Sequence, residues 1–130
     1  IMVEIQTSVG ELLDKISILK IKKQKINNES KLNNIEKELN SLLITSQNLF
    51  ENDPKVFNKF IEELMIINLN LWETEDEIRI LESKKIFNEK FIELARNVYF
   101  KNDERFQIKS KINKHYGSHI VEEKQYEDYS

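Results

Sequence analysis

Apolar residues recur at intervals of three and four along most of this chain, and that spacing is typical of amphipathic α-helices. The pattern is interrupted at residues 27–30 and 52–54 by polar residues and proline, and again at residues 83–87. We therefore expect helices over about residues 9–26, 30–50, 55–83 and 88–116. Asn102 and Asp103 interrupt the last stretch, so the sequence leaves open one long helix or two helices that meet there.

Residues with known capping preferences lie at the ends of these stretches. Ser8 and Glu11 fit a capping box, in which the Ser8 hydroxyl accepts from the Glu11 amide and the Glu11 carboxylate reaches back to residue 8. Pro54 suits the first turn of the third helix, and Asn88 suits the cap of the fourth. Gly117 follows the last periodic residue, where a left-handed residue ends many helices.

The predicted fold class is all-α, an antiparallel bundle of about four helices, or five if the last one breaks. The first six residues alternate apolar and polar side chains and favour an extended segment, at most one short strand. A lone strand needs a partner chain or a helix surface to lie on. We expect one domain over residues 1–130, with an extended segment at 1–8, the bundle at 9–116 and an acidic, tyrosine-containing tail at 117–130.

Composition excludes several classes of protein. The 130-residue chain has no cysteine, which excludes disulfides and thiolate metal sites. Its two glycines and one proline leave little material for a phosphate-cradling loop. A net charge of −3 argues against a nucleic-acid binder that relies on a basic face. No apolar run approaches the roughly 18 residues of a membrane span, and no signal segment is visible. We expect a cytoplasmic protein that binds neither nucleic acid nor membrane.

Six short segments, taken together, resemble a family of short bacterial all-helical proteins of unknown function. They are SVGELLDKI at 8–16, LWETEDEIR at 71–79, FIELARNVY at 91–99, NDER at 102–105, IN and GS at 112–118, and EEKQY at 122–126. The resemblance covers nearly the whole chain and implies that the tail through Tyr126 belongs to the domain. It also implies a setting near sugar-transferase and cell-surface polysaccharide genes, and it implies no activity.

Two pairs of carboxylates have the spacing of neighbours on one helix face. Glu11 and Asp14 lie three positions apart in the first predicted helix, and Glu73 and Asp76 repeat that spacing in the third. If the two pairs converge, they offer the oxygen ligands that Mg²⁺ prefers. The alternative is that Glu11 stabilises the start of its helix and that the other carboxylates are solvated.

Arginine is rare in this chain, which has three Arg against 17 Lys. Arg96 and Arg105 are therefore more informative than the lysines, because a guanidinium binds carboxylate or phosphate through two parallel hydrogen bonds. One interpretation is that an arginine ties the last helix to the tail carboxylates Glu122 and Glu123. The other is an anion-binding site.

We expect any functional site to be a polar pocket built from three helices. The candidates belong to the segments described above and lie at the edges of apolar stripes. They are Glu11, Asp14, Glu75, Asp76, Arg96 and Tyr99. The same residues also fit a buried ion-pair network that fixes the helices against one another and binds no ligand. No pattern identifies a catalytic residue or a resident metal site.

Two classes of function follow from these patterns. The first is a non-catalytic interaction or assembly module that needs no cofactor and works as a homodimer beside protein partners. The third helix supports the dimer, because Met65, Ile66 and Leu69 widen its apolar band and two-fold pairing commonly buries such a band. The second class is a small Mg²⁺-dependent or anion-binding helical enzyme, similar to the pyrophosphohydrolases, that acts on a nucleotide or sugar phosphate.

Overall fold

The computed structural model describes residues 1–129, and all of its regular structure is helical. The four helices are α1 (Val9–Lys25), α2 (Glu29–Asn52), α3 (Pro54–Ser83) and α4 (Glu89–Tyr116). All four agree with the predicted bounds to within two residues, and α4 continues through Asn102 and Asp103 without a break. The described residues contain no strand, and residues 1–7 are extended and exposed.

A side chain caps the beginning of each helix. Each capping oxygen accepts the backbone N–H of the residue three positions ahead, which is one of the amides that has no partner within the helix. The four caps are Ser8, Asn28, Asp53 and Asn88, with donor–acceptor distances of 3.0–3.2 Å. Gly117 ends α4 in the left-handed conformation, with φ at 62°, where glycine carries no steric penalty.

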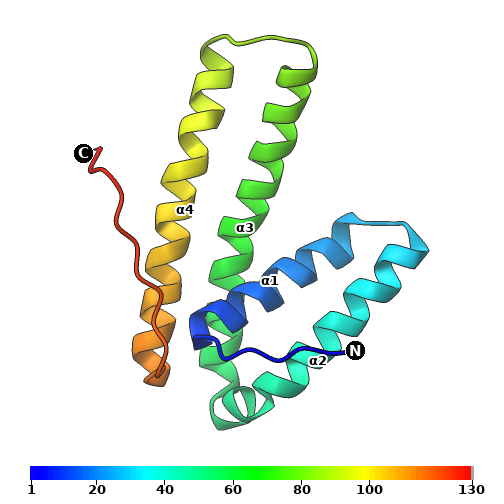
Figure 1. The fold of residues 1–130 in the computed structure, drawn as a ribbon, viewed down its shortest axis with the longest axis vertical. Helices are drawn as coiled ribbons and strands as arrows, with labels where there is room; N and C mark the ends of the chain where they lie inside the picture. The colour runs from blue at the N-terminus through cyan, green and yellow to red at the C-terminus, as the bar shows by residue number, and fades with distance from the viewer. Residues whose placement is uncertain (130) are drawn as a thin grey trace.

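Helices α3 and α4 form a long antiparallel hairpin, and α1 crosses it obliquely (Figure 1). Helix α1 contacts the other three helices, whereas α2 packs on α1 and, over a smaller area, on α3. The core lies at this crossing, where Leu13, Ile16, Leu64 and Ile112 have no exposed surface. Burying apolar area of this kind is the main stabilising contribution to the fold.

The far half of the α3–α4 hairpin extends beyond α1 and α2 (Figure 1). In α3 the buried residues end at Thr74, and in α4 they begin at Leu94. No residue between 75 and 93 is buried. We call residues 75–93 the hairpin arm.

The tail returns along α4 (Figure 1). Ser118 and Glu122 link it to α1 and α4, and the Tyr129 hydroxyl donates a hydrogen bond to Asp103 near the middle of α4. Among residues 1–129, no helix combines the length and the apolar character that crossing a bilayer requires.

Candidate functional site

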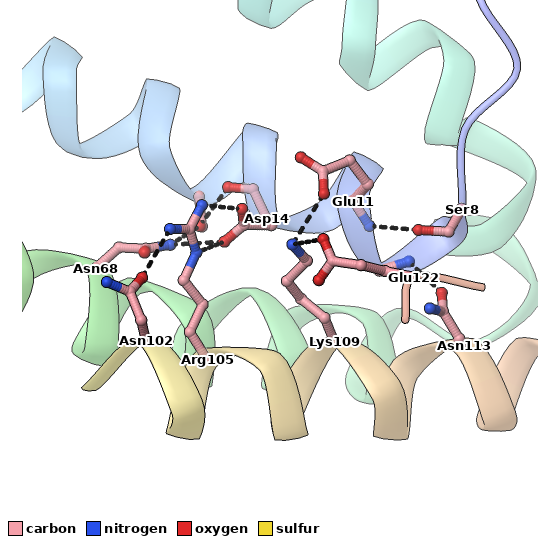
Figure 2. Close-up of polar contacts among 11 residues, drawn as sticks. Ser8, Glu11, Asp14, Asn68, Asn102, Arg105, Lys109, Asn113 and Glu122 are labelled. Atoms are coloured by element: carbon pink, nitrogen blue, oxygen red, sulfur yellow. Dashed lines mark hydrogen bonds and ion pairs between the residues drawn. The ribbon is translucent and has the colours of Figure 1, made fainter. Parts of the chain in front are cut away.

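A buried ion pair joins α1 to α4 (Figure 2). Asp14 has no exposed surface, and Arg105 contacts its carboxylate with two nitrogens. Nε donates to Oδ1 over 2.9 Å, and Nη2 donates to Oδ2 over 2.5 Å. A bidentate pair of this kind fixes orientation as well as distance. The hydrogen bond to Asp14 raises the pKa of Arg105, so the guanidinium stays charged.

Helix α3 completes the surroundings of Asp14. Asn68 is only 7% exposed, and its amide donates to Asp14 Oδ1 and to Ser17 Oγ, both over 2.9 Å. The Ser17 hydroxyl in turn donates to the Asp14 backbone carbonyl over 2.6 Å. Both amide hydrogens of Asn68 are therefore used. Three helices contribute to a polar cluster whose members satisfy one another, as buried polar groups must.

One turn further along α4, Lys109 lies between two carboxylates (Figure 2). Its Nζ is 2.8 Å from Glu11 Oε2 and 3.1 Å from Oε2 of Glu122 in the tail, and the residue is 6% exposed. Burial alone would lower the pKa of Lys109. The hydrogen bonds to Glu11 and Glu122 outweigh burial, and the pKa lies above its ordinary value of 10.5. The Ser8 hydroxyl accepts from the Glu11 amide as expected, whereas the Glu11 carboxylate points to Lys109 rather than back to Ser8.

The first turn of α1 is in direct contact with the end of α4. The Gly10 N–H donates to Asn113 Oδ1 over 2.6 Å, and the Val9 N–H donates to Ser118 Oγ over 3.2 Å. Both amides belong to the first turn, where no intrahelical acceptor exists. A Cβ on Gly10 would lie 2.6 Å from the backbone oxygen of Lys109. The close approach of the two helices therefore requires glycine at position 10.

The contacts around Arg105 and Lys109 are suited to holding helices together rather than to moving protons. A general acid or base works best with a pKa near the operating pH. The pKa values of Arg105 and Lys109 both move further above neutrality, and the carboxylates of Asp14 and Glu11 are each paired with one of these cations. We call these four side chains, together with Asn68, Ser17 and Glu122, the ion-pair network.

Two of the sequence candidates, Glu75 and Asp76, lie beside the ion-pair network without belonging to it. They line a pocket of about 360 Å³ between α1, α3 and α4, and Arg105 lines the same pocket. Glu75 also faces Arg79 on the α3 surface, with 3.8 Å between the carboxylate oxygen and Nε. Arg105 and Asn68, which also lines the pocket, therefore connect the pocket to Asp14.

The remaining candidates, Arg96 and Tyr99, lie on a different part of α4. Arg96 is exposed, and its Cζ is 5.4 Å from the ring centroid of Phe100. Tyr99 packs against Phe100 and Tyr129 and lines a cavity of about 1040 Å³ between α4 and the tail. The hydrogen bond to Asp103 raises the pKa of Tyr129 to about 12. The structure thus distributes the six candidates over three places.

The two acidic pairs face different partners. Glu11 and Asp14 face the cations of α4, while the Glu73 carboxylate is 3.9 Å from Lys25 Nζ on the surface. Within residues 1–129, no three His, Asp or Glu side chains come together as a metal ion would require. The geometry therefore gives no basis for a magnesium centre among the described residues.

Sequence reasoning did not identify Lys109, Asn68 and Asn113 as functional partners. The sequence did contain a pattern that could have identified Lys109. Arg105 and Lys109 are four positions apart, and the carboxylates of Glu11 and Asp14 are three positions apart. Each spacing places its two side chains on one helix face. Two such faces of opposite charge are a recognisable pattern for helix pairing.

The comparisons with known proteins agree with the motif-based resemblance. A family model described as a family of unknown function, DUF6165, matches residues 1–129, nearly the whole chain. The searches of curated proteins and of solved structures found no match. The resemblance is therefore confirmed as membership of a family of unknown function. The chain belongs to the DUF6165 family.

Proposed function

We propose that this protein is a non-catalytic interaction module that works as a homodimer and presents its helices to other proteins in the cytoplasm. Its partners are a second copy of this chain and other proteins, not nucleic acid or membrane. The setting implied by the family resemblance, beside proteins of sugar transfer or cell-surface polysaccharide synthesis, is part of the proposal. The observation that carries it is the hairpin arm.

The two helices of the hairpin arm leave several large apolar side chains exposed. Ile80, Ile86, Phe87 and Ile92 are between 38% and 58% exposed, and the ring of Phe87 packs edge-on against that of Phe91 at 5.2 Å. In the lower half of the molecule α1 and α2 cover the same hairpin, but no other segment of residues 1–129 covers the arm (Figure 1). Large apolar side chains that remain exposed in one part of a fold are a feature of interaction surfaces.

A second copy of the chain is the occupant that fits best. Two helical hairpins that pack face to face produce a four-helix bundle, and a two-fold axis buries the same patch on both copies. The charges favour an antiparallel pairing of the arms. Carboxylates outnumber cations toward the base of the arm, and cations outnumber carboxylates near its tip. The base has Glu75, Asp76 and Glu77 against Arg79, and the tip has Lys84, Lys85 and Lys90 against Glu82 and Glu89.

Other surfaces contribute less to the proposal. The sequence pointed to Met65, Ile66 and Leu69 as extra apolar positions on α3. Met65 packs against the core, whereas Ile66 is 65% exposed. The extended segment at residues 1–7 exposes Val3 and Ile5, at 78% and 83%. These side chains extend the apolar surface that is available to further protein partners.

Sedimentation velocity at tens of micromolar tests the dimer. We expect a species of twice the 15.6 kDa of one chain, and we expect Ile80→Glu with Phe87→Glu to convert it to the monomer. Both side chains are more than half exposed, so the substitutions should leave the fold of the single chain intact. The matched control is Ile44→Glu on α2, which is 73% exposed and lies outside the arm. A wild-type monomer, or a dimer that survives the two arm substitutions, would refute the proposed interface.

A further inference from the structure

The pocket at the base of the hairpin arm has the features of a small-molecule site. Its volume of about 360 Å³ is near the lower end of the range for ligand pockets. Ile18, Ile21 and Leu71 provide an aliphatic lining, and Trp72 adds a half-buried indole. The indole N–H has no acceptor within residues 1–129. An apolar lining with a few convergent polar groups is the usual composition of a ligand pocket.

One side of the pocket offers a fixed donor. Asp14 engages Nε and Nη2 of Arg105, so the guanidinium cannot turn away (Figure 2). Its Nη1 makes only a 3.4 Å contact with Asn102 Oδ1, which is longer than a good hydrogen bond. The Arg105 side chain keeps 27% of its surface exposed. Arg105 Nη1 is therefore available to donate one charge-assisted hydrogen bond to an oxygen acceptor such as a carboxylate.

Negative charge lines the pocket as well. Asp76 is exposed and has no hydrogen bond or ion pair within the described residues, and Glu75 lies beside it. Asp14 already balances the charge of Arg105, and Arg79, which lies 3.8 Å from Glu75, does not line the pocket, so the carboxylates of Asp76 and Glu75 repel a simple anion. They attract an ammonium group instead, and the face of a tryptophan attracts a cation too. The ligand must therefore carry a cation together with its oxygen acceptor.

We propose that this pocket binds a small zwitterion with an apolar body, of the class of the free aliphatic α-amino acids. The ammonium group lies against Asp76 and Glu75, and the carboxylate accepts from Arg105 Nη1. The apolar side chain packs among the aliphatic residues and Trp72. The site is built from α1, α3 and α4 of a single chain, and its Glu75 and Asp76 also belong to the base of the hairpin arm.

The single tryptophan of the chain makes the test direct. In a ¹⁵N-labelled sample of the full chain, one indole N–H cross-peak reports on Trp72. We expect L-leucine to shift this peak saturably. Isoamylamine lacks the carboxylate and 4-methylpentanoate lacks the ammonium, and we expect each to bind at least tenfold more weakly. Equal shifts from all three compounds, or a shift that grows linearly without saturating, would overturn the proposal.

Two substitutions locate the ammonium group. Asp76→Asn removes the exposed charge and should weaken leucine binding at least tenfold while leaving the melting temperature unchanged; Glu75→Gln provides a second measurement at the same place. The matched control is Glu77→Gln, the exposed neighbour that does not line the pocket. Leucine affinity that stays at the wild-type value in both Asp76→Asn and Glu75→Gln would exclude this site.

Discussion

Arg105 holds the carboxylate of Asp14 with two nitrogens, although 91 positions separate the two residues in the sequence. The contact joins the second turn of α1 to the middle of α4. Because Asp14 is fully buried, its charge must be compensated by a cation at a matching position along α4. The pair therefore sets how far along the hairpin α1 crosses.

Removal of Arg105 should be costly. Arg105→Ala leaves a buried carboxylate without its cation, and breaking a buried pair in this way costs about 3–5 kcal/mol. The control is Lys15→Ala, which breaks the exposed α1–α2 pair with Glu38 and should change stability by no more than about 1 kcal/mol. Urea unfolding followed by circular dichroism measures both. Equal losses in the two variants would show that the buried pair does not hold α1 on α4.

The paired replacement Asp14→Leu with Arg105→Met tests where that cost comes from. Apolar residues of similar volume often replace a buried ion pair without loss of stability. We expect the double variant to be more stable than Arg105→Ala alone, because no buried charge remains. If it is less stable than the single variant, packing of the guanidinium, rather than compensation of charge, maintains the contact.

Gly10→Ala should destabilise the protein, although alanine normally stabilises a helix relative to glycine by roughly 0.5–1 kcal/mol. The added Cβ would lie 2.6 Å from the Lys109 carbonyl oxygen, which belongs to the backbone of α4 and cannot turn aside. Overpacking of this kind typically costs about 1–3 kcal/mol. Thermal unfolding gives the sign, and a raised melting temperature would contradict the close approach of the helices.

Lys109 should stabilise the fold in a way that depends on pH. The folded protein raises the pKa of Lys109 above 10.5, so it holds this proton more tightly than the unfolded chain does. The contribution is complete below about pH 10.5 and is lost as the pH rises through the raised value. We expect the stability difference between wild type and Lys109→Met, from urea unfolding between about pH 8 and pH 11.5, to shrink toward the alkaline end. A difference that grows with pH would have the wrong sign.

Asn68→Leu should destabilise the core despite adding an apolar side chain. The substitution removes the hydrogen bonds to Asp14 Oδ1 and Ser17 Oγ, and a lost hydrogen bond costs about 0.5–1.5 kcal/mol, or up to about 3 kcal/mol where the acceptor is charged. The matched control is Asn70→Leu, two positions away on the exposed side of α3. Chemical denaturation compares the two variants, and an Asn68→Leu protein as stable as wild type would refute this role.

The helices could be predicted because their signals are local. Ser8, Pro54 and Asn88 bound them as expected, and the continuous α4 resolves the alternative that Asn102 and Asp103 left open. Local patterns of this kind depend on neighbours three or four positions away, which a single sequence displays in full.

The partners of the candidate residues could not be predicted in the same way. Arg105 was expected to contact the tail carboxylates or an anion, but it contacts Asp14, and Lys109 is the residue that reaches Glu122. Arg96 was expected beside Asp14 and lies instead over Phe100. These contacts depend on the oblique crossing of α1 over the hairpin, which the apolar stripes do not specify.

The order in which the chain is synthesised gives the contact between Asp14 and Arg105 a further consequence. Asp14 is synthesised first, and Arg105 follows 91 positions later. At ordinary translation rates this interval lasts roughly 5–20 s. During that interval α1 and α2 can pack together, but the chain does not yet contain Arg105 to compensate the charge of Asp14 on burial. We therefore expect the burial of α1 to wait for α4, and the nascent chain to remain sensitive to proteases until its final third has emerged.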